Sequence, residues 1–143
     1  MVNTFLPYPS FIESAIVLDY RRLNKQILEC DQILKAIEKE NSGFQGNIGW
    51  VNHPATRMWK GYELCLKAYR DMMLSEWLVR GYNTTRQFLI PPDSTDVIIY
   101  PKWLGDPNFH AAHRSNLLRK DPIHYGQFGW TEPDNLEYIW PVS

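Results

Sequence analysis

Four polar residues near the start of the chain recur at steps of three and four: Arg22, Lys25, Gln26 and Glu29. In an α-helix this spacing places all four on one face. The cations can bind phosphate, and a carboxylate among them can act as a general base or stabilise a cationic intermediate. A solvated helix face with internal ion pairs gives the same pattern, so the spacing leaves both interpretations open.

Two further segments contain histidine. In Trp50-Val51-Asn52-His53-Pro54, with Arg57 close behind, the histidine is expected at a helix start, where the dipole lowers its pKa. It can bind a ligand there or simply cap the helix. The second segment is basic and contains His110, His113, Arg114, Arg119 and Lys120. No cysteine or carboxylate at zinc-like spacing completes a metal set, so this segment favours phosphate contacts.

The composition is that of an ordinary globular domain, with 143 residues, 44% of them hydrophobic and 22% charged. Because the net charge is −1, any nucleic-acid site must come from local clustering of basic residues. The chain contains no P-loop, dinucleotide-binding, nucleophile-elbow, zinc-protease or Cys-x-x-Cys motif. We also find no signal peptide and no apolar run of about 20 residues, which predicts a cytoplasmic protein without membrane contact. Cys30 and Cys65 are expected to be reduced core residues.

Periodicity and capping signals predict three helices after an extended, proline-containing segment, Met1–Pro9. The first begins at a capping box, Ser10 to Glu13, and ends near Glu40. The second runs from His53-Pro54 to Arg80-Gly81 and contains Gly61, and the third runs from Asp106-Pro107 to Lys120. The expected buried face of the first helix comprises Ile12, Ile16, Tyr20, Leu23, Ile27, Cys30, Leu34 and Ile37. That of the second comprises Ala55, Met58, Trp59, Tyr62, Leu66, Tyr69, Met73 and Trp77.

The remaining segments read as loops and coil. Asn41–Asn52 is a polar loop, and Tyr82–Gly105 is irregular, with a possible short strand at Val97–Tyr100. The aromatic tail, Tyr125–Ser143, is expected to wrap the helices as ordered coil. The predicted fold class is therefore all-α: one compact domain over residues 1–143, with about three helices, two of them long, an extended N-terminal segment and a coil-rich C-terminal tail.

The order of these motifs resembles the pyrimidine-dimer DNA glycosylase family of the endonuclease V type, and within it a branch of largely uncharacterised bacterial and viral members. The resemblance rests on Asn3–Pro9, Leu18–Gln26, Trp50–Pro54, Arg80–Asn83 and His113–Pro122. It implies an all-α domain whose amino terminus threads between helices toward the active centre. The implied activity is cleavage of a glycosidic bond followed by β-elimination at the abasic site. The implied partner is damaged double-stranded DNA, bound by a monomer that needs no metal or cofactor.

The resemblance also implies a nucleophile, the free α-amino group of the chain, which belongs to Val2 after removal of Met1 or to Met1 itself. An α-amine has a pKa near 8, so part of it is neutral and can form a Schiff base with the sugar. Arg22 occupies the position of the family's catalytic glutamate, and Glu29, two turns further along the same helix face, is our candidate replacement.

The remaining residue roles follow by position. Arg21 matches a phosphate-contacting arginine of the family, and Lys25 matches a basic residue. His53 matches a histidine at the start of the second helix, and His113 or Arg114 lies near a basic residue of the third. The residues predicted to contact DNA are Arg21, Lys25, Gln26, His53, Arg57, His110, His113, Arg114, Arg119 and Lys120.

Two other functions fit the same residues. The first is a non-catalytic nucleic-acid-binding module that keeps this scaffold, which is suggested by Arg22 at the catalytic position. The second is an enzyme acting on a modified nucleotide, with Glu29 and His53 as its acid–base pair.

Overall fold

The computed structural model describes residues 3–142, so Met1, Val2 and Ser143 lie outside the described residues. Its α-helices are α1 (Phe11–Val17), α2 (Tyr20–Asn41), α3 (Pro54–Arg57), α4 (Glu63–Val79), α5 (Pro107–Lys120) and α6 (Pro122–Tyr125), followed by a 3₁₀ turn at Gly126–Phe128. No strand occurs within residues 3–142, which confirms the all-α class. The possible strand at Val97–Tyr100 is wrong, because this run has no neighbouring strand with which to pair.

The predicted first helix is broken between α1 and α2. Leu18 adopts an extended backbone, with ψ of 137°, and the Asp19 side chain caps α2 by accepting a hydrogen bond from the Arg22 amide. A single helix from Ser10 to Glu40 is therefore wrong, because Asp19 starts a second one. The break also changes the buried face. Leu23, Ile27, Cys30 and Ile37 are buried as expected, whereas Ile12, Ile16 and Tyr20 are about half exposed.

The predicted second helix is also broken, at Gly61. This glycine has a φ of +89°, a left-handed conformation that ends the α3 segment before α4 begins. A continuous helix from His53 to Arg80 is therefore wrong, although Trp59 and Leu66, on either side of the break, are both fully buried. Gly81 terminates α4 with a φ of +90°, as predicted.

The third predicted helix is confirmed as α5. Asp106 caps it by accepting a hydrogen bond from the Asn108 amide, and Pro107 occupies its first turn. Sequence reasoning missed the short α6, which Pro122 begins directly after α5. The two cysteines are buried free thiols, as expected.

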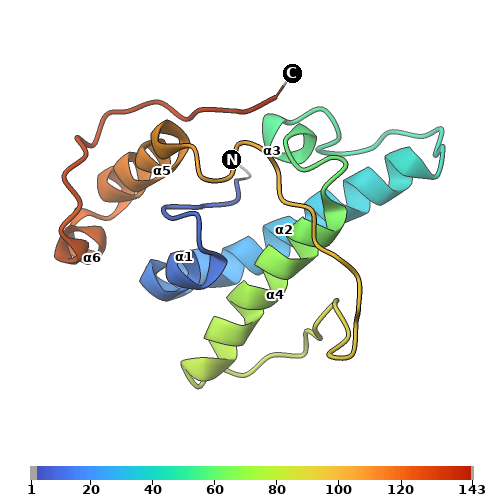
Figure 1. The fold of residues 1–143 in the computed structure, drawn as a ribbon, viewed down its shortest axis with the longest axis horizontal. Coiled ribbons are helices and arrows are strands. Elements are labelled where there is room, and N and C mark those ends of the chain that lie inside the picture. The colour runs from blue at the N-terminus through green and yellow to red at the C-terminus, as the bar shows by residue number, and fades with distance from the viewer. Residues whose placement is uncertain (1–2, 143) are drawn as a thin grey trace.

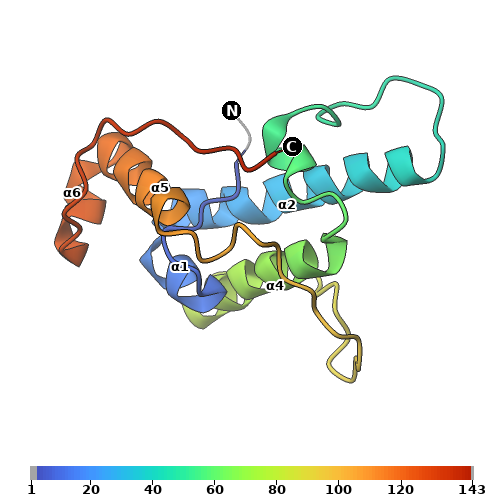
Figure 2. The ribbon, with the colours of Figure 1, turned by 45° about the horizontal axis from the view of Figure 1, so that its top comes forward.

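The long helices α2 and α4 pack against each other, and α1 packs on α4 (Figure 1). The N-terminal segment, Asn3–Tyr8, runs between α2 and α5 in both views (Figures 1 and 2). Beyond α6 the C-terminal tail turns back along α5 toward α3 (Figure 2), and its aromatic residues Trp130, Tyr138 and Trp140 pack against the core. The prediction of an ordered tail is confirmed. Within residues 3–142, no helix combines the length and apolar character needed to cross a lipid bilayer.

The break at Gly61 can be tested by Gly61→Ala. A Cβ there meets no atom within 4 Å, so the only penalty is the left-handed backbone. We expect the free energy of unfolding to fall by about 1–2 kcal/mol in urea titrations. In a continuous helix the same change would raise it by about 1 kcal/mol. Gly49→Ala is the matched control, because its Cβ also enters open space and its backbone is not left-handed. Stabilisation by Gly61→Ala would contradict the observed break.

Candidate active site

Side chains, not a neighbouring strand, hold the N-terminal segment in place. The Phe5 amide donates to Gln26 Oε1 at 2.7 Å, and the Phe5 carbonyl accepts from the Tyr69 hydroxyl at 2.6 Å. Further along, the Leu6 amide donates to His113 Nδ1 at 2.8 Å. Other backbone partners of the segment are Glu29 at Asn3, His110 at Leu6, Arg114 at Pro7 and Ser14 at Tyr8, and Trp59 donates to the Thr4 hydroxyl. The extended backbone thus has the hydrogen bonds that a buried segment requires.

Two of the predicted DNA-binding histidines belong to this set. His110 donates from Nδ1 to the Leu6 carbonyl at 2.7 Å while its Nε2 accepts from the Gly105 amide at 2.8 Å, an arrangement that only the neutral ring can make. His113 accepts at Nδ1, so its proton is on Nε2. Burial lowers the pKa of both rings, and that of His113 falls to about 3. Both rings are almost fully buried and present no exposed surface to a ligand. Their contacts with DNA therefore stay predictions that the structure does not support.

Arg114 is likewise engaged inside the protein. Its guanidinium donates to the Pro7 carbonyl at 2.7 Å and forms two bonds, at 2.9 and 3.1 Å, with the Glu132 carboxylate. This ion pair lowers the pKa of Glu132. Arg114 therefore joins the N-terminal segment to the C-terminal tail.

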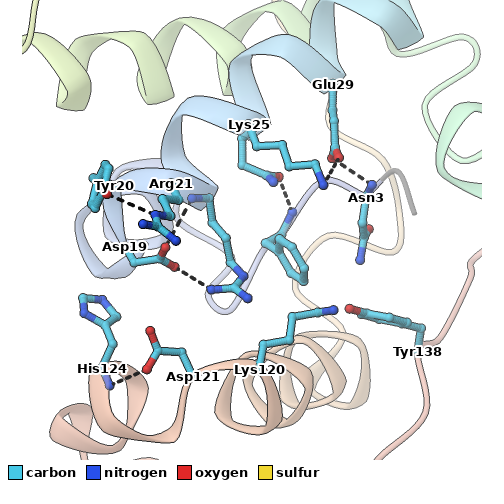
Figure 3. Close-up of a pocket in the computed structure, with 13 residues that line it drawn as sticks. Asn3, Asp19, Tyr20, Arg21, Lys25, Glu29, Lys120, Asp121, His124 and Tyr138 are labelled. Carbon is cyan, nitrogen blue, oxygen red and sulfur yellow. Dashed lines mark hydrogen bonds and ion pairs between the residues drawn. The ribbon is translucent and has the colours of Figure 1, made fainter.

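A pocket of about 710 Å³ opens where the N-terminal segment meets α2, α6 and the tail (Figure 3). Six predicted site residues line it: Arg21, Arg22, Lys25, Gln26, Glu29 and Lys120. The other lining residues are Asn3, Phe5, Asp19, Tyr20, Asp121, His124 and Tyr138. His53, Arg57, His110, His113, Arg114 and Arg119 are not among its lining residues. The charged stripe on the helix therefore faces a concave site.

The Glu29 carboxylate lies beside Asn3, the first residue that the structure describes. Its Oε2 accepts from the Asn3 amide at 2.9 Å, and its Oε1 lies 3.8 Å from Lys25 Nζ. The residue is 5% exposed. Burial raises the pKa of Glu29, and the hydrogen bond from Asn3 and the charge of Lys25 only partly oppose that effect. A carboxylate with a raised pKa is a stronger base and is suited to proton transfer.

The pocket is rich in cations although the whole chain is not. Arg21, Arg22, Lys25 and Lys120 surround it, together with three carboxylates. Arg22 donates to Asp19 at 3.1 Å, and the exposed Arg21 lies over the Tyr20 ring, 5.6 Å from its centroid. Partial burial and the neighbouring cations, Arg22 first among them, lower the pKa of Lys120. Four cations and three carboxylates therefore meet at one pocket of a protein whose net charge is −1.

The remaining predicted residues lie elsewhere. His53 caps α3, accepting at Nδ1 from the Ala55 amide at 3.0 Å, and its ring packs edge-on against Trp50 and Trp140. Arg57 pairs with Glu40 at 3.0 Å, and Arg119 bonds to Asn116. Because Glu29 lines the pocket and His53 does not, the geometry gives no support to an acid–base pair of these two residues.

Sequence reasoning missed Asn3 and Tyr138 as pocket residues. Asn3 lies in the motif Asn3–Pro9, so its position in the resemblance was a signal that could have been used. Tyr138 had no such signal, because its place depends on the path of the tail across α5, which no local pattern encodes (Figure 2).

An all-helical domain with a buried carboxylate at its amino terminus and a cation-lined pocket has the features of an enzyme that acts on a phosphate-bearing substrate. The sequence model of one family, described as pyrimidine dimer DNA glycosylase, matches residues 2–90. The chain belongs to this family, whose description indicates a DNA glycosylase of pyrimidine-dimer repair and hence DNA binding. The match includes Glu29 and ends before α5. No curated protein and no solved structure matches the chain.

Anchoring by neutral histidines predicts acid sensitivity. The pKa of His113 is about 3 in the folded protein and about 6.5 in an unfolded chain. Between these values the unfolded state binds the extra proton, so the free energy of unfolding falls by about 1.4 kcal/mol per pH unit as the pH drops. This contribution is complete above about pH 6.5 and is lost toward pH 3. His110 acts in the same direction.

Urea titrations between about pH 4 and 7 measure this slope. His113→Gln keeps an acceptor for the Leu6 amide but removes the titrating ring, so its slope is expected to be smaller by about one proton. Comparing the two proteins at each pH cancels the other titrating groups. Equal slopes would show that His113 is not held neutral.

Proposed function

We propose that this protein is a DNA glycosylase with an associated abasic-site lyase activity. In this proposal the N-terminal α-amine is the nucleophile, and Glu29 accepts the proton that the amine loses. The supporting observation is the 2.9 Å hydrogen bond between the Asn3 amide and Glu29 Oε2. Val2 and Met1 lie outside the described residues. In a chain processed to begin at Val2, however, covalent geometry keeps the amine within one residue, about 3.6 Å, of the Asn3 nitrogen.

The reaction begins when the neutral amine forms a bond to the sugar C1′. The bond from C1′ to the base nitrogen breaks, and its electron pair leaves with the base. Glu29 accepts the proton that the amine loses and returns it to O4′ as the sugar ring opens, which gives a protonated Schiff base. In the lyase step a C2′ proton is removed and the C3′–O bond breaks, with its electrons leaving on the phosphate. Burial of Glu29 suits it to both proton transfers, because it raises the pKa of the carboxyl.

The cations of the pocket would bind the DNA backbone in this proposal. Arg21, Arg22, Lys25 and Lys120 present charge toward the same cavity, and such contacts orient a duplex without reading its sequence. Arg22, at the position of the family's catalytic glutamate, would serve a phosphate, while Glu29 supplies the carboxylate from two turns further along α2.

The role of Glu29 is tested by Glu29→Gln. This substitution keeps an acceptor for the Asn3 amide but removes the base, so the single-turnover rate on duplex DNA with a thymine dimer or an abasic site should fall about 10²- to 10⁴-fold. Glu38→Gln is the matched control, because it makes the same change at an exposed position of α2 outside the pocket. An unchanged rate for Glu29→Gln would remove Glu29 from the mechanism.

The nucleophile can be located by borohydride trapping on abasic DNA followed by proteolysis and mass spectrometry. We expect the adduct on the first residue of the chain, and we expect a retained N-terminal extension to abolish it, since the extension moves the amine away from Glu29. An adduct on Lys25 or Lys120 would contradict the α-amine as nucleophile. Tight binding to damaged duplex with no adduct would instead indicate a non-catalytic binding module.

A further inference from the structure

One donor in the N-terminal segment is left without a partner. The Asn3 side chain is 98% buried, since the residue is only 2% exposed, and its Nδ2 has no hydrogen-bond partner within residues 3–142. The other polar groups near it are engaged: the Asn3 backbone amide donates to Glu29, and Asn3 Oδ1 accepts from the Thr4 amide at 2.8 Å. A buried donor without an acceptor is unfavourable, and in a binding pocket the ligand is the natural source of that acceptor.

The direction of this amide limits which ligand atom it can reach. In Figure 3 the Asn3 side chain points away from Glu29 and across the pocket toward Lys120 and Tyr138. The Asn3 amide acts toward the Tyr138 hydroxyl as a hydrogen-bond donor and so partly offsets the rise in pKa that burial gives Tyr138, although no hydrogen bond of ordinary geometry joins the two groups. The amide therefore faces the cavity beside this hydroxyl.

The surroundings of the amide favour a base over a phosphate. Phe5 and Tyr138 line this part of the pocket, with ring centroids 6.3 Å apart and planes tilted by 48°. Aromatic faces stack on nucleobases, whereas phosphates are better bound by the cations Arg21, Arg22 and Lys25 on α2. A neutral amide donor beside these two aromatic residues matches a base carbonyl.

We propose that Asn3 Nδ2 donates a hydrogen bond to the carbonyl oxygen next to the glycosidic nitrogen of the departing pyrimidine. This inference rests on the proposed function. When the bond from C1′ to N1 breaks, its electron pair is shared between N1 and that oxygen, two bonds away. A fixed donor stabilises this negative charge and so favours departure of the base. Asn3 is thereby a catalytic residue of the glycosidic step. The abasic sugar carries no base, so the β-elimination step lacks this contact.

The test compares two rates in one protein. Single-turnover reactions on thymine-dimer duplex, treated with alkali, measure glycosidic cleavage, and reactions on abasic duplex without alkali measure elimination. Asn3→Ser removes the Nδ2 donor and leaves a shorter hydroxyl in its place. Asn3→Asp removes the Nδ2 donor too while keeping Oδ1 for the Thr4 amide, in case the serine variant folds poorly. We expect the ratio of glycosidic cleavage to elimination to fall about 100-fold. Asn52→Ser, an exposed asparagine outside the pocket, should leave the ratio unchanged.

A second readout does not need catalysis. Affinity for thymine-dimer duplex, divided by affinity for a duplex with a tetrahydrofuran abasic analogue, should fall about 2- to 10-fold in the Asn3 variants. A parallel fall of both rates, or no change in their ratio, overturns the role of Asn3. If the wild-type protein cleaves neither substrate, the proposed function fails, and the affinity ratio alone then decides. A selective loss on the dimer duplex supports the base contact, and equal losses on both duplexes reject it.

Discussion

The rest of the structure depends on one set of interactions, the hydrogen bonds by which helix side chains hold the extended N-terminal segment. A buried strand outside a sheet has backbone donors and acceptors that no neighbouring strand can satisfy. Here the helices supply the missing partners: Gln26 from α2, Tyr69 from α4, and His110 and His113 from α5. The helices α2 and α4 lie on one side of the segment, and α5 lies on the other (Figures 1 and 2). The helices are held in relation to each other because each contributes part of the same set of bonds, and that set ends at Asn3, whose amide donates to Glu29.

This constraint explains why so many polar residues lie inside a small helical domain. His110 and His113 must be neutral to accept and donate as they do, and burial keeps them neutral. The partly buried Arg114 guanidinium has its hydrogen-bond acceptors in Glu132 and the Pro7 carbonyl. An unpaired polar group in the interior destabilises the fold by more free energy than one hydrogen bond contributes. Loss of one bond therefore weakens the others, and the set is cooperative.

The same constraint defines what could be predicted from the sequence. Capping residues act over a few positions, so Ser10 and Asp106 were assigned correctly from local signals. Asp19 is an equally local signal, but the apolar steps from Ile12 to Tyr20 continue the helical period across it, although those side chains are about half exposed. The charged stripe was also predictable, because helix geometry alone puts Arg22, Lys25 and Glu29 on one face. The histidines were not, since a basic helix that binds DNA and one that holds a buried segment have the same residue types and spacing. Only the path of the segment distinguishes the two.

The same constraint bears on Arg22, which the resemblance places at the position of the family's catalytic glutamate. A carboxylate serves an N-terminal amine only if it lies where the chain ends, and that place depends on the bonds along the segment. Residues seven apart on a helix share a face but are separated by about 10 Å along its axis. With Phe5 bound to Gln26, the next free face position toward Asn3 is Glu29, and Arg22 lies beside Asp19 at the far end of the pocket. The route of the segment along α2 therefore selects which residue of the stripe lies beside Asn3, and that residue is Glu29.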